Sequence, residues 1–481
     1  MLDIEPKRVF FYFEQIASIP HGSYNTKIIS DYVVSVAEDL GLIYYQDDNN
    51  NVIVYKAGQC GGEDKESVII QGHLDMVCEK EEGCDIDFEK DGLKLVLEDG
   101  MLSAEGTTLG GDDGIAVAFM LALLEDKEVS HPPLECVFTV DEEVGMLGAM
   151  SLDKTRLMGK RLLNLDSEDE GHLLISCAGG ATATMNIPIR RRGAQGERYC
   201  LIASGFIGGH SGVEIDKGRA NADIVLGYAL KELTYVDDTL KLIGIKGGLK
   251  DNAIPVKAVA EFVTKRPDII KDQLPELIAR IKETYGENDR NITFTFSKVE
   301  DDDEYEGMYP IDEMESLNLI MLLGSAPFGV RKMSSDIEGL VQTSLNLGIL
   351  YTTEDSVIIS YSVRSSVEEE KKELLDELST FARSVGGSVS VEGDYPAWEY
   401  REDSPLRKVM LETYREMFDK EMIVEAIHAG LECGIFSGAI PSLDVVSFGP
   451  DILDIHTPKE RMSIKSVERT WNYLNRVLEK L

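Results

Sequence analysis

The sequence predicts an α/β protein with an open sheet, into which a second, α+β domain is inserted. The chain has 481 residues, about three times the length of a typical domain. Strand and helix patterns alternate from the N-terminus to about residue 180 and again after residue 398. Between these points the pattern changes to one dominated by strands. The predicted domains are therefore 1–185 together with 395–481, and the insertion 186–394.

The elements of the first domain follow from the spacing of apolar residues. Apolar residues at three- and four-residue intervals predict helices, and short aliphatic and β-branched runs predict buried strands. Helices are expected at 9–17, 26–40, 115–125, 405–418, 431–437 and 466–480, and strands at 52–55, 67–71, 134–140, 162–165 and 445–448. Open α/β sheets bind ligands at the carboxyl ends of their strands, so functional residues are expected there.

The inserted domain divides into two halves that each resemble a β-α-β-β-α-β unit. The first half has predicted strands at 181–189, 198–204, 240–245, 256–263 and 292–296, and helices at 219–233 and 267–284. The second has predicted helices at 314–323 and 367–385, and strands at 343–351, 356–363 and 388–392. No residue-level repeat relates the halves. An acidic, turn-rich stretch at 300–307 is the predicted connector.

The charge of the chain excludes two classes of partner. Asp and Glu number 87 against 48 Lys and Arg, which gives a formal net charge of −39. Nucleic-acid binding needs basic residues that neutralise phosphates, and anionic membranes attract basic segments. We therefore expect no nucleic acid and no membrane among the partners. Hydrophobic residues make up 43% of the chain, as in ordinary globular proteins, so the excess acid is expected on a solvated surface.

The N-terminal and cysteine patterns predict a cytoplasmic protein. Residues 1–19 mix charged with apolar residues, unlike a signal peptide, and no run of about 18 apolar residues predicts a membrane span. The seven cysteines are scattered without a CxxC pair, so neither a thiolate zinc site nor a dithiol redox motif is expected. Reduced cysteines in the cytoplasm are the simplest interpretation.

Acidic and histidine-bearing motifs follow the predicted strands. His73 and Asp75 come after the strand at 67–71, and two residues apart they face the same side. The run Gly110–Gly114, with Asp112 and Asp113 at its centre, leads into the helix at 115–125. Taken alone, the first motif also suits a surface pair, and the second an acidic helix cap.

Three further motifs complete the set. Glu142 and Glu143 lie in an acidic run after the strand at 134–140, Asp166 follows the strand at 162–165, and His456 lies beyond the last strand. Separately, these fit a solvated loop, a strand-end turn and a loop histidine. Together, imidazole and carboxylate ligands suit zinc, manganese or cobalt. Five ligands are too many for one tetrahedral zinc and suit two ions that share a bridging carboxylate.

At these residues the chain resembles the dinuclear-zinc exopeptidases related to glutamate carboxypeptidase, and within them the aminoacyl-histidine (Xaa-His) dipeptidases. The motifs are GHLDMVCEK (72–80), GTTLGGDDGIAVA (106–118), TVDEEVGMLGA (139–149), LLNLDSEDEG (162–171), GGHSGVEID (208–216) and SFGPDILDIHTPKERM (447–462). The resemblance implies a catalytic three-layer α/β/α domain with a mixed sheet, and an inserted α+β lid domain. It also implies two divalent ions per chain, Zn²⁺ first and Mn²⁺ or Co²⁺ as alternatives.

The resemblance also implies a role for each motif residue. The metal ligands would be His73, Asp112, Glu143, Asp166 and His456, with Asp112 as the bridge. Asp75 would orient His73, and Glu142 would be the general base. A cis peptide bond would join Asp112 to Asp113. Relatives often carry Asn at the second position, so either acid could bridge, and the register to the following glycine favours Asp112.

Three residues of the inserted domain have implied roles toward the substrate. His210 would polarise the scissile carbonyl, while Asn252 and Arg364 would bind the substrate's terminal carboxylate; a surface ion pair explains Arg364 nearly as well. Gly430 lies in a loop that the family uses near its site, and His428 is either structural or adjacent to the substrate. The implied partners are small peptides, with a homodimer left open.

The implied activity is hydrolysis of unblocked dipeptides such as β-alanyl-histidine. A deacetylase or desuccinylase of N-acyl amino acids could use the same centre, and a non-catalytic metal-binding protein could retain the fold. The presence of Glu142 beside all five ligands favours an enzyme, since a binding relic need not keep the base. A calcium-binding protein is excluded, because the chain has no D-x-D-x-D-G loop and imidazoles are poor calcium ligands.

Overall fold

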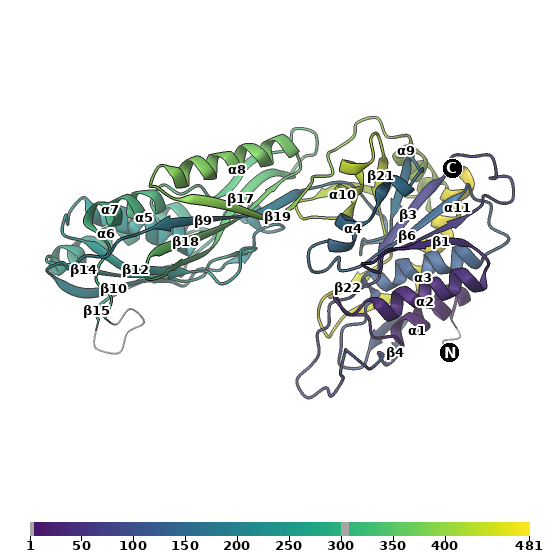
Figure 1. The fold of residues 1–481 in the computed structure, drawn as a ribbon, viewed down its shortest axis with the longest axis horizontal. Coiled ribbons are helices and arrows are strands. Elements are labelled where there is room, and N and C mark those ends of the chain that lie inside the picture. The colour runs from purple at the N-terminus through teal and green to yellow at the C-terminus, as the bar shows by residue number, and fades with distance from the viewer. Residues whose placement is uncertain (1–3, 300–306) are drawn as a thin grey trace. The chain divides into compact units, whose positions relative to one another are not determined.

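A computed structural model describes residues 4–299 and 307–481 (Figure 1). It divides into two compact units. The first comprises Met1–Cys177, Trp398–Ala426 and Leu431–Leu481, and the second comprises Ala178–Ala397 and Ile427–Gly430. The predicted connector lies, up to residue 306, outside the described residues. The boundary predicted at residue 185 falls inside a strand of the second unit, β9 (Gly179–Pro188).

The first unit is built on an eight-stranded mixed sheet, as expected. Its order is β1 (Ile43–Gln46), β2 (Val52–Lys56), β6 (Leu134–Thr139), β3 (Val68–His73), β7 (Arg161–Asn164), β21 (Asp444–Ser447), β8 (His172–Cys177) and β20 (Ile423–Ile427). Strands β6, β3, β7 and β21 run parallel, while β1, β2 and β8 pair antiparallel with their neighbours. The parallel strands are almost fully buried, which is why their sequences are continuous apolar runs.

Helices cover both faces of this sheet, which gives the three predicted layers. They are α1 (Lys7–Ala17), α2 (Lys27–Asp39), α3 (Gly111–Glu125), α4 (Leu147–Ser151), α9 (Pro405–Phe418), α10 (Glu432–Ala439) and α11 (Ile464–Lys480). Gly72 of β3 faces α3, whereas the side chain of Gln71 contacts Glu432 of α10. Since neighbouring strand residues point to opposite faces, α3 and α10 lie on opposite sides of the sheet. Helices α1, α2 and α3 pack together (Figure 1).

A small antiparallel sheet in the first unit joins two segments that are distant in sequence. Its order is β22 (Ile452–Leu453), β23 (Arg461–Ser463), β5 (Met101–Ala104) and β4 (Leu95–Glu98). Met462 pairs with Leu102, so the C-terminal segment lies beside the chain that leads to α3. These strands have two to four residues and were not predicted, because none is a continuous buried run like the equally short β7 and β21.

In its described residues, the second unit contains a nine-stranded antiparallel sheet and four α-helices. The sheet order is β15 (Thr293–Lys298), β10 (Glu197–Ser204), β14 (Ala258–Thr264), β12 (Lys241–Gly247), β17 (Val341–Thr352), β18 (Ser356–Ser365), β9 and β19 (Ser388–Tyr395), with β16 (Gly329–Met333) paired to β17. Strands β11 (Gly209–His210) and β13 (Ala253–Ile254) form a separate pair. The helices are α5 (Ala222–Thr234), α6 (Pro267–Tyr285), α7 (Glu313–Leu323) and α8 (Glu368–Arg383).

The two predicted halves are present, but the first is inserted within the second. Elements β10-α5-β12-β14-α6-β15 form one β-α-β-β-α-β unit, with sheet order β15-β10-β14-β12. The other consists of β9, which precedes the first half, and α7-β17-β18-α8-β19, with order β17-β18-β9-β19. In both, the first strand lies between the third and the last. Strand β9, predicted with the first half, therefore belongs to the second.

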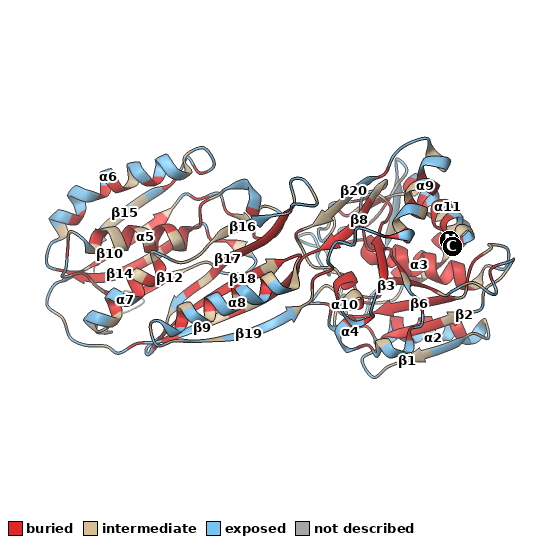
Figure 2. Cartoon of the chain, turned by 90° about the horizontal axis from the view of Figure 1, so that it is seen from above, coloured by how far each residue is buried: buried red, intermediate tan, exposed pale blue. Residues whose placement is uncertain are grey.

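The core of the second unit lies between one face of its sheet and the four helices. Alternate residues of β9 and β10 are buried, such as Met185, Ile187, Tyr199 and Leu201, and they join apolar residues of α5–α8 in one cluster. Figure 2 shows the helices with exposed outer faces and buried inner ones. No helix in residues 4–299 or 307–481 combines the length and apolar character that crossing a membrane requires.

Candidate metal centre

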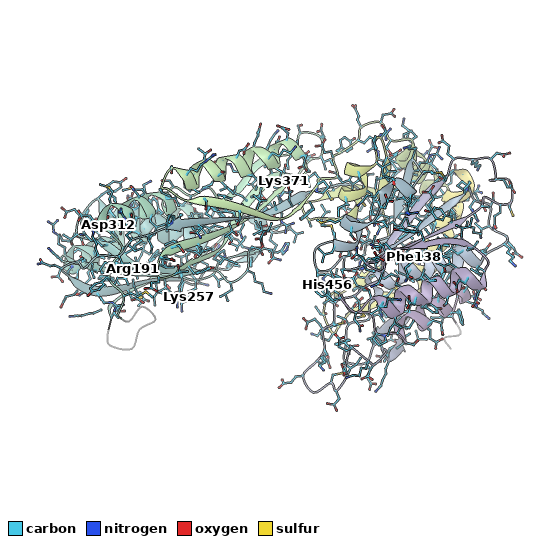
Figure 3. The ribbon with its side chains drawn as sticks, viewed as in Figure 1. Phe138, Arg191, Lys257, Asp312, Lys371 and His456 are labelled. Carbon is cyan, nitrogen blue, oxygen red and sulfur yellow. The ribbon has the colours of Figure 1, made fainter. Side chains whose placement is uncertain are left out.

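The predicted metal ligands of the first unit converge at one edge of its sheet. His73 ends β3, the acids Glu142 and Glu143 follow β6, and Asp166 follows β7. These three strands are parallel neighbours, so their carboxyl ends meet. Asp112 enters from the start of α3. His456 enters from a loop after β22, where Figure 3 labels its half-exposed side chain.

Asp112 lies between the two histidines. Its Oδ1 is 3.2 Å from Nε2 of His73, and its Oδ2 is 3.0 Å from Nε2 of His456. Each imidazole also has a second carboxylate nearby: Asp166 Oδ1 lies 3.8 Å from His73 Nε2, and Glu143 Oε1 lies 3.0 Å from His456 Nε2. One carboxylate therefore divides its oxygens between two groups of ligands, as a bridging ligand must.

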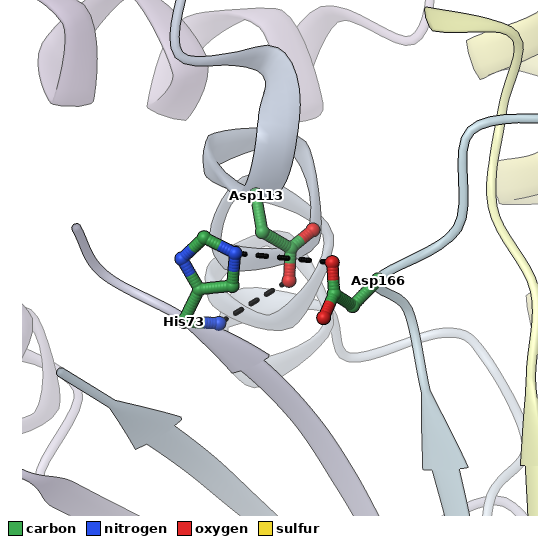
Figure 4. Close-up of side chains that lie close together, drawn as sticks. All are labelled: His73, Asp113 and Asp166. Carbon is green, nitrogen blue, oxygen red and sulfur yellow. Dashed lines mark hydrogen bonds and ion pairs between the residues drawn. The ribbon is translucent and has the colours of Figure 1, made fainter. Parts of the chain in front are cut away.

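Asp113 occupies a different position from Asp112. The bond between them is cis, as the resemblance implies. Asp113 Oδ2 accepts a hydrogen bond of 3.2 Å from the backbone N–H of His73 (Figure 4). Its carboxyl also comes within 4.8 Å of ligand atoms of His73 and Asp166. Its closest contact with His73 is nevertheless the backbone N–H, whereas Asp112 contacts imidazoles on both sides.

Asp75 is buried behind His73 and holds the acidic loop. Its Oδ1 accepts a hydrogen bond from the N–H of Glu142 at 3.0 Å, and its Oδ2 from the N–H of Glu143 at 3.3 Å and the hydroxyl of Ser23 at 2.8 Å. Nδ1 of His73 lies 3.0 Å from the backbone oxygen of Asp75 and 3.5 Å from its Oδ1. Facing two acceptors, Nδ1 carries a proton, so that the neutral ring would offer the lone pair of Nε2 to a metal ion on the side of Asp112.

Burial and mutual repulsion shift the pKa values of this cluster. Burial, reinforced by neighbouring acids, raises the pKa of Glu142 to about 8 and that of Asp166 well above its ordinary value. Hydrogen bonds to Asp112 and Glu143 raise the pKa of His456 to about 10. Burial lowers the pKa of His73, but contacts with Asp112 and Asp75 outweigh it and raise that pKa well above normal. The carboxylates therefore attract positive charge.

The donor set fits divalent metal ions. Four overlapping groups of three side chains place their ligand atoms within 4.8 Å of one another, and together they include His73, Asp112, Glu143, Asp166 and His456. Oε1 of Glu143 is buried and lies 3.0 Å from Nε2 of His456. Imidazole nitrogens mixed with carboxylate oxygens are the ligands that zinc and related ions prefer.

Three glutamates at this centre, of which Glu432 and Glu460 are buried and Glu168 is half-buried, were not among the predicted residues. Glu460 binds the turn that carries Asp112, and Glu432 accepts a hydrogen bond of 2.7 Å from Thr139. Glu168 has a ligand atom within 4.8 Å of those of Asp112 and Asp166. Burial raises the pKa of Glu432 and of Glu168 to about 7. Glu168 and Glu460 lie within the motifs that carry the resemblance, and Glu432 lies two residues after Gly430. Their closeness to these motifs along the chain could have marked them as candidates.

His210 and Asn252 are neighbours in the second unit. Strands β11 and β13 pair His210 with Ala253, and the N–H of Ser211 donates to the backbone oxygen of Asn252 at 2.8 Å. Nδ1 of His210 accepts from the N–H groups of Gly212 at 3.1 Å and of the next residue at 3.3 Å. Burial lowers the pKa of His210, so the ring is neutral and its proton is on Nε2, as a hydrogen-bond donor.

Arg364 lies in β18 of the same unit, beside a buried histidine. Its Nη1 donates to the hydroxyl of Tyr395 at 3.2 Å, and its Nε is buried without a partner. Across the strand pair lies Ser344, whose hydroxyl is 2.7 Å from Nε2 of His428. Burial, and then the charge of Arg364, lowers the pKa of His428 to about 3, so this ring is neutral. Within residues 4–299 and 307–481, Arg364 forms no ion pair with a carboxylate.

Known proteins resemble the chain over almost its whole length. The profile of Peptidase family M20/M25/M40 matches residues 69–480. The chain is 34% identical over 482 residues to the cytosol non-specific dipeptidase of Escherichia coli (strain K12), covering 99% of this chain and 98% of that protein. It superposes on the crystal structure of aminoacylhistidine dipeptidase from Vibrio alginolyticus with a TM-score of 0.91 and 33% identity, covering 100% of this chain and 97% of that one.

A more distant structure shares the fold alone. Aminopeptidase PepT from Bacillus cereus superposes with a TM-score of 0.58 at 16% identity, covering 99% of each chain. The family profile and the two nearer relatives confirm the resemblance that the motifs indicate. The chain belongs to Peptidase family M20/M25/M40 and is a hydrolase of peptide bonds.

Proposed function

We propose that this peptidase hydrolyses unblocked dipeptides, Xaa-His dipeptides among them, with two divalent ions at the centre in the first unit. The main support for this proposal is that Asp112 contacts both His73 and His456, and that each histidine lies near a second carboxylate. Zinc is the first choice of ion, given the ligands. The printed names of the E. coli and Vibrio relatives, a non-specific dipeptidase and an aminoacylhistidine dipeptidase, support the substrate class.

Glu142 is the proposed general base. Two divalent ions, when bound, lower the pKa of a shared water and stabilise negative charge that develops on the substrate. Glu142 has a ligand atom within 4.8 Å of those of His73 and Glu143, and its N–H is held by Asp75. It accepts a proton from the attacking water and returns that proton to the leaving amine, so that its protonation state is restored after each turnover.

Residues of the second unit are proposed to act on the substrate. His210 presents an N–H donor at Nε2, which suits the carbonyl oxygen as it becomes negative. Arg364, with a buried unpartnered Nε, suits the terminal carboxylate of a dipeptide, and Asn252 is a second candidate for that group. Replacement of His210 by Ala should lower kcat, whereas replacement of Arg364 by Lys should mainly raise KM. An unchanged KM in the second variant would contradict the assignment.

A reconstitution experiment tests the reaction and the metal together. Metal-stripped protein is loaded with zinc, manganese or cobalt and assayed against β-alanyl-histidine, other dipeptides and N-acetyl amino acids. We expect turnover of free dipeptides with at least one ion and none without metal. Turnover restricted to N-acetyl amino acids would instead establish a deacetylase. Metal binding without any turnover would establish a binding protein.

Two adjacent glutamates provide a matched pair for assigning the base. Glu142→Gln should lower kcat by about 10²–10⁴-fold, the usual contribution of general acid–base catalysis, while both ions stay bound. Glu143→Gln should instead lower the metal content, because this residue contacts His456 at the second group of ligands. Elemental analysis and kinetics of both variants separate the two roles. A Glu142→Gln variant with normal kcat would refute the assignment of the base.

We also propose a cytoplasmic location. No described helix suits a membrane span, and the E. coli relative is named a cytosolic enzyme. Cell fractionation with an antibody against the chain tests this, and recovery in the membrane or secreted fraction would contradict it.

A further inference from the structure

Glu460 lies in one of the motifs but was not predicted to act at the centre, and its carboxylate makes an unusual set of contacts. It is 2% exposed and lies four residues after His456. Its Oε2 accepts hydrogen bonds from the N–H groups of Leu109 at 2.8 Å and Gly110 at 3.2 Å. Its Oε1 accepts from Gly111 at 2.8 Å and Asp112 at 3.4 Å. One carboxylate therefore binds four successive backbone N–H groups.

These N–H groups require an acceptor from elsewhere in the chain. Residues 109–112 are buried, and the backbone torsions of Asp112 and Asp113 are not helical, so the regular part of α3 starts only after them. Gly110 precedes with φ of 65°, and no side chain of the turn itself caps it. Buried backbone N–H groups are almost always paired, and successive N–H groups of this kind form a concave site for an anion. Glu460 is the anion here.

The same side chain links the two segments that supply the bridging carboxylate and one histidine. Asp112 belongs to the turn that Glu460 binds, and His456 belongs to the loop that carries Glu460. Strand β23 starts directly after Glu460 and pairs with β5, which fixes the register of this loop against the chain leading to the turn. The 3.0 Å contact between Asp112 and His456 thus spans two segments that Glu460 holds together.

We infer that Glu460 is a positioning residue, which presets Asp112 and His456 for metal binding and so sets the metal affinity of the centre. This inference rests on the proposed metal centre. A Gln side chain has the same size but only one acceptor oxygen, so its NH₂ group would face two of the four N–H donors. The turn would then have to shift, and Asp112 with it. Loss of such a supporting contact typically lowers metal affinity by about 10–100-fold.

The test measures zinc binding directly and needs no turnover. Metal-free wild-type, Glu460→Gln and Glu460→Asp proteins are titrated with zinc against a competing chelator, and their folding is checked by circular dichroism. We expect Glu460→Gln to bind zinc about 10–100-fold more weakly than wild type, as loss of a supporting contact typically does. We expect Glu460→Asp, which keeps the charge, to recover part of the affinity. Excess zinc should restore most of the kcat of Glu460→Gln and leave KM for a dipeptide unchanged.

A second buried glutamate provides the matched control. Glu135 is also 2% exposed, in the same unit, and accepts hydrogen bonds from the N–H groups of Met158 at 2.9 Å and Gly159 at 3.0 Å. Glu135→Gln should lower the unfolding temperature while its zinc affinity stays that of wild type. If folded Glu460→Gln also binds zinc as tightly as wild type, the inference is overturned and the proposed centre stands. If wild-type protein itself binds no zinc, the proposed centre fails.

Discussion

Replacing Asp75 by Asn removes one charge from the centre and leaves the shape of the side chain unchanged. The two oxygens of Asp75 accept three hydrogen bonds, from the N–H groups of Glu142 and Glu143 and from the hydroxyl of Ser23. In either orientation of the new amide, its NH₂ group faces at least one of the two backbone N–H donors. The smallest loss is therefore one buried hydrogen bond to a charged acceptor, which is about 1.5–3 kcal/mol.

This free energy predicts the loss of activity. The lost bond holds the loop that carries Glu142, the proposed general base, so its free energy should appear in transition-state stabilisation. At about 1.4 kcal/mol per factor of ten, kcat/KM of Asp75→Asn should fall by about 10- to 150-fold. The assay is dipeptide hydrolysis at saturating zinc, with zinc content measured on the same sample.

Ser23→Ala provides a control with a smaller expected effect. It removes one of three donors to Asp75 but keeps the charge of Asp75 and both backbone hydrogen bonds to the loop, so its kcat/KM should fall less than that of Asp75→Asn. If zinc-loaded Asp75→Asn retains the kcat/KM of wild type, or loses less than Ser23→Ala, Asp75 does not hold the loop in its working position.

Three other predictions concern stability and packing. Asp223 is fully buried, neither of its oxygens has a hydrogen-bond partner among the residues that the structure describes, and burial raises its pKa well above normal. The folded protein favours the neutral form of Asp223. The free energy of unfolding is therefore highest below the pKa that Asp223 has in the unfolded chain, and it falls as pH rises, by up to about 1.4 kcal/mol per pH unit. The free energy of unfolding of Asp223→Asn, measured in urea, should therefore rise relative to that of wild type between about pH 5 and about pH 8. A difference between the two that stays constant over this range would contradict the prediction. Chelation should lower the unfolding temperature reversibly, since each ion at 100 times its Kd adds about 2.7 kcal/mol, and no change in calorimetry would argue against bound metal. Gly72→Ala would place a methyl 2.4 Å from Asp113 Oδ2 and 2.6 Å from Cβ of Ala116, so it should destabilise by about 1–3 kcal/mol and lower activity; a wild-type urea midpoint would contradict it.

Long amphipathic helices and buried parallel strands were predictable, because their apolar periodicity is local. The helix expected at 466–480 is α11 (Ile464–Lys480), and the strand expected at 134–140 is β6 (Leu134–Thr139). The short strands β4, β5, β22 and β23 were not predicted, since they are partly exposed and lack the continuous buried run of β7 and β21. The placing of β9 in the second half of its sheet depends on pairing with β18 and β19, which are more than 160 residues further along the chain.

The positions of the metal-ligand candidates were predictable for a similar reason. His73 and Asp166 directly follow strand patterns, and parallel strands bring their carboxyl ends to one edge whatever their order. The choice between Asp112 and Asp113 was not predictable in this way. It depends on His456, 344 residues away, and on which carboxylate the backbone turn directs at it.

The sequence by itself determined the fold class, the strand-end histidine and acids, and the likeness to a metallopeptidase family, because each is carried by residues close together along the chain. The sequence also predicts no nucleic acid among the partners, because net charge needs no coordinates. Only the tertiary structure decided that Asp112 lies between both histidines, that Glu460 binds the turn beneath it, and that Asp223 is buried without a partner. These contacts join segments that sheet order and register bring together, and no local pattern records them.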